Sequence, residues 1–136
     1  MSMAEGGSCF IDVPASQGSL RETIGNALQS SGIQMAGSED FNGTSLPVRA
    51  IQWADLVIAD ITLLGPYAFY ALGVADALHK PVLVIGQRPV NFFGDFAGHK
   101  LLTYGPEEFE KLAGYIQYWV RDMLESSAQR PYTIAL

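Results

Sequence analysis

The stretch that decides the fold is ADLVIADITLLGPYAFYALGVADALHKPVLVI, residues 54–85. Leu56 to Ala59 form a continuous apolar run without alternation, which is typical of a strand buried on both faces, and Asp60 stands at its carboxyl end. Pro66 then opens a helix, because proline is favoured in a first helical turn. Pro81 ends this helix, and Val82 to Ile85 form a second buried strand. The stretch therefore predicts a β-α-β unit with parallel strands.

The same alternation extends in both directions. Upstream we expect a strand from Cys9 ended by Pro14, a helix from Ser19 to Gly32 with a Ser19–Glu22 capping box, a short strand over residues 33–36, and a helix from Ser45 to Trp53. Downstream we expect an edge strand over residues 100–104 and a last helix. Phe109, Leu112, Ala113, Ile116, Val120 and Met123 form its apolar stripe. For the helix after Pro66 we expect Phe69, Leu72 and Leu78 to face the sheet, with Gly73 allowing close approach.

Five strands alternating with helices predict a flavodoxin-like α/β fold, a three-layer sandwich with a five-stranded parallel sheet in the order 2-1-3-4-5. The 136 residues suffice for one core, so we expect one domain over residues 9–125, a disordered start over 1–8 and a tail over 126–136. In such sheets ligands bind beyond the carboxyl ends of the strands, where the strand order reverses. That rule predicts a site between the first and third strands.

Composition restricts the partners. The chain has 14 acidic and 8 basic side chains, and a net charge of -6 argues against nucleic acid as a partner. A single cysteine, Cys9, excludes a disulfide framework and a thiolate zinc cluster, so we expect a cytoplasmic protein without metal or cofactor. No apolar run approaches the length of a membrane span. His79 and His99 lack ligand-like neighbours at metal spacing.

The pattern ADLVIADIT, Pro66 and FYALGVADALHKPVLVI, within Ile51 to Ile85, resembles the nucleoside 2-deoxyribosyltransferase-like domains, which are close in fold to Toll/interleukin-1 receptor (TIR) domains. The resemblance implies a domain for nucleosides, nucleotides or nicotinamide dinucleotides that acts as a hydrolase or transferase at the N-glycosidic bond, often as a homo-oligomer. It also implies a catalytic glutamate just before the Leu-Gly pair. Ala71 stands there, and a methyl group supplies neither a nucleophile nor a negative charge.

Three explanations for Ala71 stay open: natural loss of catalysis with a retained binding pocket, a deliberate substitution of an active site glutamate, or an enzyme that uses another acid. Asp76 would point away from the cleft, and Asp95 lies in a Phe-rich connection over residues 86–98. Asp60 could bind a ribose hydroxyl or could cap the turn of Thr62 to Gly65. The candidate ligand-binding residues are Asp12, Pro14, Ser16, Asp60, Thr62, Pro66, Tyr67 and Tyr70.

The alternative function is a catalytically inactive TIR-like interaction module that assembles with itself or with a partner. Two apolar segments, Val90 to Phe93 and Tyr132 to Leu136, motivate it, because exposed apolar surface marks contacts.

Overall fold

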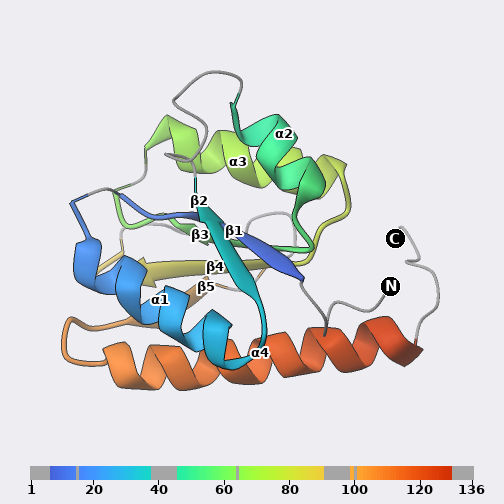
Figure 1. Ribbon diagram of the computed structural model, residues 1–136. Coiled ribbons are helices and arrows are strands. Elements are labelled where there is room, and N and C mark those ends of the chain that lie inside the picture. The colour runs from blue at the N-terminus through green and yellow to red at the C-terminus, as the bar shows by residue number, and fades with distance from the viewer. Residues whose placement is uncertain are drawn as a thin grey trace.

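The computed structural model describes residues 7–14, 16–37, 46–63, 65–90, 99 and 101–129. Within these ranges strands and helices alternate along the chain, as Figure 1 shows. The elements are β1 (Ser8–Asp12), α1 (Gly18–Ser30), β2 (Gln34–Gly37), α2 (Leu46–Trp53), β3 (Leu56–Asp60), α3 (Pro66–Ala77), β4 (Val82–Gln87), β5 (Leu101–Tyr104) and α4 (Phe109–Gln129). The last helix continues past Ser126, where we expected the tail to begin.

The five strands form one parallel sheet in the order β2-β1-β3-β4-β5. Both the flavodoxin-like fold class and the strand order are therefore confirmed. Since α1 and α3 connect parallel strands, they run antiparallel to them, so their amino ends lie beside the carboxyl ends of the strands, as does the amino end of α4, which follows β5 (Figure 1). This edge is the one at which a ligand site is expected.

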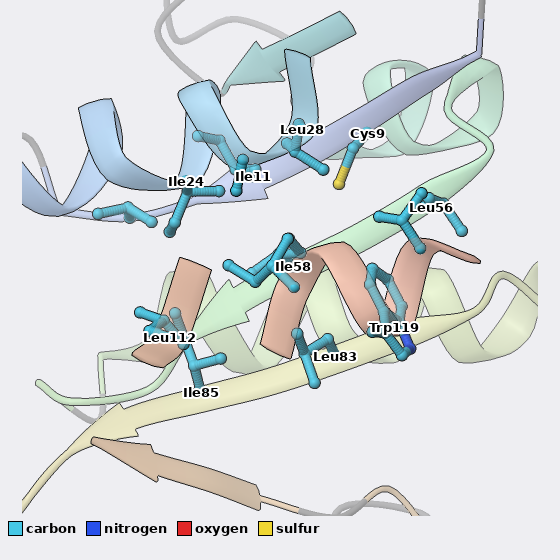
Figure 2. Packing of buried hydrophobic residues seen from close by; sticks show 14 of the residues in the cluster. Cys9, Ile11, Ile24, Leu28, Leu56, Ile58, Leu83, Ile85, Leu112 and Trp119 are labelled. Carbon is cyan, nitrogen blue, oxygen red and sulfur yellow. The ribbon is translucent and has the colours of Figure 1, made fainter. Parts of the chain in front are cut away.

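Alternation along the strands divides the core between two faces. Cys9 and Ile11 of β1 face α1 and α4, where Figure 2 shows them packed with Leu28, Ile58 and Trp119. Phe10 of the same strand faces α2 and α3 and packs with Ile51, Val57, Ala71 and Ala75. Side chains of successive strand residues point to opposite faces, so a sheet covered on both faces needs the unbroken apolar runs seen in the sequence.

The predicted stripe of α4 is confirmed. Leu112, Ile116 and Val120 are buried, and Phe109, Ala113 and Met123 pack against the same cluster. Trp119, which the stripe did not include, is buried with them.

One local prediction was wrong and another was right only in part. Ser19 lies inside α1, whose N-cap is Gln17 with no side-chain cap hydrogen bond, so the expected capping box does not form. In α3 Leu72 is buried and Phe69 packs against the same cluster, as expected, but Gly73 and Leu78 are exposed, and the other buried residues are Ala68, Ala71 and Ala75. Apolar residues surround this helix on all sides, so their spacing does not identify the inner face.

Several expectations fall on residues that the structure does not describe: Ser45, Asp95, most of the connection over residues 86–98, and the segment Tyr132 to Leu136. Of Val90 to Phe93, only Val90 is described, and it packs partly buried against the cluster of Ala59 and Leu72. No helix within the described ranges has both the length and the apolar character needed to cross a membrane.

Candidate functional site at the carboxyl edge of the sheet

Asp12 and Asp60 end two neighbouring parallel strands. Asp12 of β1 is registered with Ala59 of β3, so the two aspartates lie at the same edge, at the point where the strand order reverses. They belong to opposite faces of the sheet, because Asp12 alternates with Phe10 on the α2–α3 face and Asp60 with Ile58 on the α1–α4 face. The carboxyl ends of β1 and β3 therefore lie side by side, as the sequence predicted.

Asp60 is 4 % exposed and is held by several hydrogen bonds. Its Oδ1 accepts from the backbone N–H of Thr62 at 2.8 Å and from the Thr62 hydroxyl, while the hydroxyl of Tyr104 donates to Oδ2 at 3.2 Å. The Thr62 hydroxyl accepts in turn from the backbone N–H of Gln87 at 2.9 Å. This network joins the ends of β3, β4 and β5. The contacts correspond to a turn cap, and contact of Asp60 with a ligand stays a prediction.

Tyr104 is a neutral donor in this network. Burial, and then the charge of Asp60, raise the pKa of its hydroxyl. The hydroxyl therefore keeps its proton across the physiological range and continues to donate to the Asp60 carboxylate.

Asp12 differs from Asp60 in being only half-buried. Burial, and secondarily the neighbouring charge of Asp60, raise the pKa of Asp12 from 3.8 to about 6. A carboxyl group that exchanges its proton near pH 6 can accept a hydrogen bond when ionised and donate one when protonated. Such perturbed groups gather at functional sites, although structural networks also produce them.

The remaining predicted residues follow these strands. Pro14 is half-buried after β1, and its carbonyl accepts from the N–H of Gln17 at 2.9 Å, which leaves Ser16 exposed in the turn. Pro66 opens α3 after Gly65, which gives the helix no side-chain cap. Pro14, Thr62 and Pro66 thus lie in the segments that leave the two strand ends.

The two tyrosines lie elsewhere on α3. Tyr70 is 53 % exposed and shares the outer side of the helix with Gly73 and Ala77, away from the sheet. Tyr67 is exposed in the first turn, closer to the carboxyl edge. The structure therefore separates Tyr70 from Asp12 and Asp60.

Ala71 is fully buried, in the cluster of Phe10, Ile51, Val57 and Ala75. Side chains of a helix lean toward its amino end, and the amino end of α3 lies at the carboxyl edge of the sheet. A longer side chain at position 71 would consequently extend past Phe10 toward the edge that carries Asp12. As the chain stands, a methyl group packs in an apolar environment.

The other candidate acid of α3 is engaged far from this edge. The Oδ1 atom of Asp76 pairs with Nε2 of His99, which precedes β5. Since α3 runs antiparallel to the strands, this pair lies toward their amino ends, as expected for an acid that points away from the cleft.

Sequence reasoning missed the residues that β4 and β5 contribute. The carboxyl ends of these strands carry no conspicuous motif, although they contribute Gln87, Arg88 and Tyr104. The one feature of the sequence that could have indicated a contribution to the site was the tyrosine at the end of the fifth strand. Arg88 also pairs with Glu108, which accepts from the N–H of Gly105 at 2.8 Å, and these bonds lower the pKa of Glu108. Arg88, Tyr104 and Glu108 border a hollow of about 250 Å³, which Lys111 and Tyr115 also line.

No family model matches this chain, and no curated protein matches it. Solved structures do resemble it, and two of them share a TM-score of 0.57. One is a 2-deoxyribosyltransferase from the psychrotolerant bacterium Bacillus psychrosaccharolyticus, with 14 % identity over 80 % of this chain and 92 % of that chain. The other is a response regulator receiver domain protein from Bacillus halodurans, with 15 % identity over 84 % of this chain and 96 % of that chain.

These likenesses show the fold alone. A transferase and a receiver domain are equally similar to the chain, so the backbone does not distinguish between their functions. The family resemblance expected from the sequence is supported as a distant resemblance in fold. Among the residues that the structure describes, no group of three or more His, Cys, Asp or Glu side chains could hold a metal ion.

Proposed function

We propose that the carboxyl edge between β1 and β3 binds a nucleoside-type or nucleotide-type ligand, and that the chain as written does not cleave the N-glycosidic bond. The observation that carries this proposal is Asp12, a half-buried carboxyl group with a pKa of about 6 at the end of the strand beside Asp60. The motif of residues 54–85, which resembles nucleoside 2-deoxyribosyltransferase-like domains, and the distant structural likeness to one such transferase support the ligand class.

The two aspartates are suited to different tasks. Both carboxylate oxygens of Asp60 already accept hydrogen bonds, so this side chain positions the edge. Asp12 is the better partner for a sugar hydroxyl, which can donate to its ionised form. A phosphate group would be repelled by the aspartates and would fit better at the first turn of α3, where Gly65 leaves backbone N–H groups without a side-chain cap.

The absence of turnover follows from position 71. Cleavage of an N-glycosidic bond builds positive charge on the sugar, and a nearby carboxylate must attack or stabilise it. Ala71 provides no such group, and Asp76 is paired with His99 toward the other edge of the sheet. Loss of the central acid therefore remains compatible with a retained binding edge.

Calorimetric titration with deoxynucleosides, deoxynucleoside monophosphates and nicotinamide dinucleotide tests the binding. We expect one of these classes to bind the unchanged chain at pH 7.5, and Asp12→Asn to weaken that binding about tenfold, because a charge-assisted hydrogen bond contributes about 1.5 kcal/mol. Asp122→Asn, which changes an exposed acid on α4, is the matched control and should bind like the unchanged chain. Absence of binding by all three classes would overturn the proposal.

Chromatography of released base tests the role of position 71. We expect no release by the unchanged chain or by Ala71→Gln, which matches glutamate in size but lacks its charge, and measurable release by Ala71→Glu. Thermal unfolding of each variant shows whether it is folded, since a larger side chain must displace atoms around Phe10. Base release by the unchanged chain would contradict the proposed loss of catalysis.

A further inference from the structure

The hollow of about 250 Å³ lies between β5 and the first turns of α4, away from the junction of β1 and β3. Because β5 is the edge strand and β4 separates it from β3, the hollow lies about 10 Å from the strand that ends in Asp60. Its volume is slightly below the range of about 300–1,000 Å³ that is typical of sites for drug-sized ligands. The hollow therefore has room for a small molecule only.

One part of the lining is apolar. Leu112 is 2 % exposed and belongs to the core cluster between the sheet and α4, and Leu102 packs against the same cluster. Tyr115 lines the hollow from the next turn of α4 and is 42 % exposed, so one side of its ring remains free for contact. Leucine side chains beside an accessible tyrosine ring favour an apolar, and in particular an aromatic, group.

The other part of the lining is charged. Glu108 pairs with Arg88 through Oε1, and its Oε2 lies 3.7 Å from Nζ of Lys111. One carboxylate thus holds two cations side by side, so the lining carries two positive charges and one negative charge in a chain whose net charge is -6. The neighbouring acids Glu107 and Glu110 are exposed to solvent, which screens their charge.

The guanidinium group of Arg88 is held in a fixed place. Its Nη1 donates to the hydroxyl of Thr103 at 3.2 Å, and its Nη2 donates to Glu108. A Cβ atom added at Gly105 would lie 3.2 Å from Nη2, so the absence of a side chain at position 105 lets the guanidinium approach the backbone closely. A guanidinium has more N–H donors than these two described partners use, and its planar fork suits a carboxylate.

We propose that the hollow between β5 and α4 binds a small organic acid with one carboxylate and an aromatic body. Arg88 and Lys111 receive the carboxylate, because two cations against one acid leave a net positive charge for a single anionic group. Leu102, Leu112 and Tyr115 contact the aromatic body. Inorganic phosphate carries more negative charge and has no apolar part, so it matches the lining less well. This site does not depend on the proposed ligand at β1 and β3 or on position 71.

A titration with phenylacetate, followed by the amide resonances of the protein, tests the site. We expect saturable shifts at Gly105, whose N–H donates to Glu108, with a dissociation constant on the order of 1 mM, as small ligands of this size allow. Phenylacetamide has the same shape without the charge, and inorganic phosphate has charge without the ring. Each should bind at least about tenfold more weakly, because each uses only one part of the lining.

Two arginine variants provide a matched comparison. Arg88→Gln should weaken phenylacetate binding at least about tenfold, because it removes a charge-assisted hydrogen bond. Arg49→Gln, at an exposed position of α2 across the sheet, changes the net charge equally and should bind like the unchanged chain. Lys111→Met removes a charge from a side chain that is 82 % exposed, so it should leave the fold intact and weaken binding about threefold.

Thermal unfolding shows whether Arg88→Gln is folded; if it is not, Lys111→Met and the comparison with phenylacetamide decide the question. The proposal is overturned if phenylacetate causes no saturable shift at Gly105, if phenylacetamide or phosphate binds as tightly as phenylacetate, or if Arg88→Gln and Arg49→Gln weaken binding equally.

Discussion

At the scale of single residues, the hydroxyl of Tyr104 is the clearest test of the polar network. It donates to Asp60 Oδ2 at 3.2 Å across 44 residues of sequence, inside the protein. Tyr104→Phe leaves that oxygen without its donor, so we expect the free energy of unfolding at pH 7 to fall by about 1–2 kcal/mol in urea titrations. Tyr118→Phe, at a 60 % exposed position on α4, is the control and should change it by less than about 0.5 kcal/mol. Equal effects of the two substitutions would contradict the network.

Asp12 links stability to pH. Its pKa is raised from 3.8 to about 6 on folding, so the folded chain binds more protons than the unfolded chain between these values, and stability declines as pH rises through this window. A shift of about two units corresponds to about 3 kcal/mol, which solvent screening of a half-exposed group reduces to about 1–2 kcal/mol. Asp12→Asn should therefore stabilise the protein by about that amount at pH 7.5.

The pH dependence distinguishes stabilisation by removal of the Asp12 charge from a stabilisation that does not depend on that charge. Below pH 3.8 Asp12 is protonated in both states, so the gain from Asp12→Asn should shrink steadily as guanidinium titrations move from pH 7.5 toward pH 4. Asp122→Asn, which removes an exposed charge on α4, should show no comparable trend. A gain of the same size at both pH values would show that Asp12 is not penalised by its charge.

At the scale of helices, α1 and α3 end in the same way with different residues. In α1 the N–H of Ile33 donates to the carbonyl of Leu28, and Gly32 takes the left-handed φ of 78° that this ending requires. In α3 the N–H of Lys80 donates to the carbonyl of Ala75, and His79 takes a φ of 58°. A residue with a Cβ atom is strained in this left-handed region of backbone conformation, whereas glycine is not.

The two ends therefore predict opposite effects of exchanging side chains. His79→Gly should raise the free energy of unfolding by about 1 kcal/mol, and Gly32→Ala should lower it by a similar amount, both followed by thermal unfolding. His79→Ala removes the same imidazole but keeps a Cβ atom in the left-handed region, so it controls for the loss of the side chain. Destabilisation by His79→Gly would mean that the side chain makes contacts that outweigh its backbone strain.

The sequence predicted those parts of the molecule that local patterns determine. The unbroken apolar run of β3 and Gly32 after α1 fixed the elements, and the rule for strand ends located Asp12 and Asp60. Prediction from the sequence failed for those features that depend on how elements far apart in the sequence pack together. The apolar residues of α3 allowed no choice of inner face, and Tyr104 could not be joined to Asp60 without knowing which face of β5 it occupies.

At the scale of the whole molecule, one sheet separates two apolar layers. Ile58 is buried against α1 and α4, and its neighbour Val57 is buried against α2 and α3. Because both side chains come from β3, at the centre of the sheet, loss of packing on either face should weaken the same structure. The fold therefore predicts a single cooperative unfolding transition in place of two.

Truncating these neighbours tests that prediction. Ile58→Ala should cost about 2–5 kcal/mol, and Val57→Ala about 1.5–3 kcal/mol, without a change in the denaturant dependence of unfolding. Trp119 is 8 % exposed in the α1–α4 layer and reports on that layer by fluorescence, whereas circular dichroism follows all helices. Trp53→Phe, at a 79 % exposed position, removes the second signal. If the two layers unfold together, Val57→Ala should lower the denaturation midpoint measured by Trp119 fluorescence as much as the midpoint measured by circular dichroism, although Val57 lies on the other face of the sheet. An unchanged midpoint of Trp119 fluorescence would show that the two layers unfold independently.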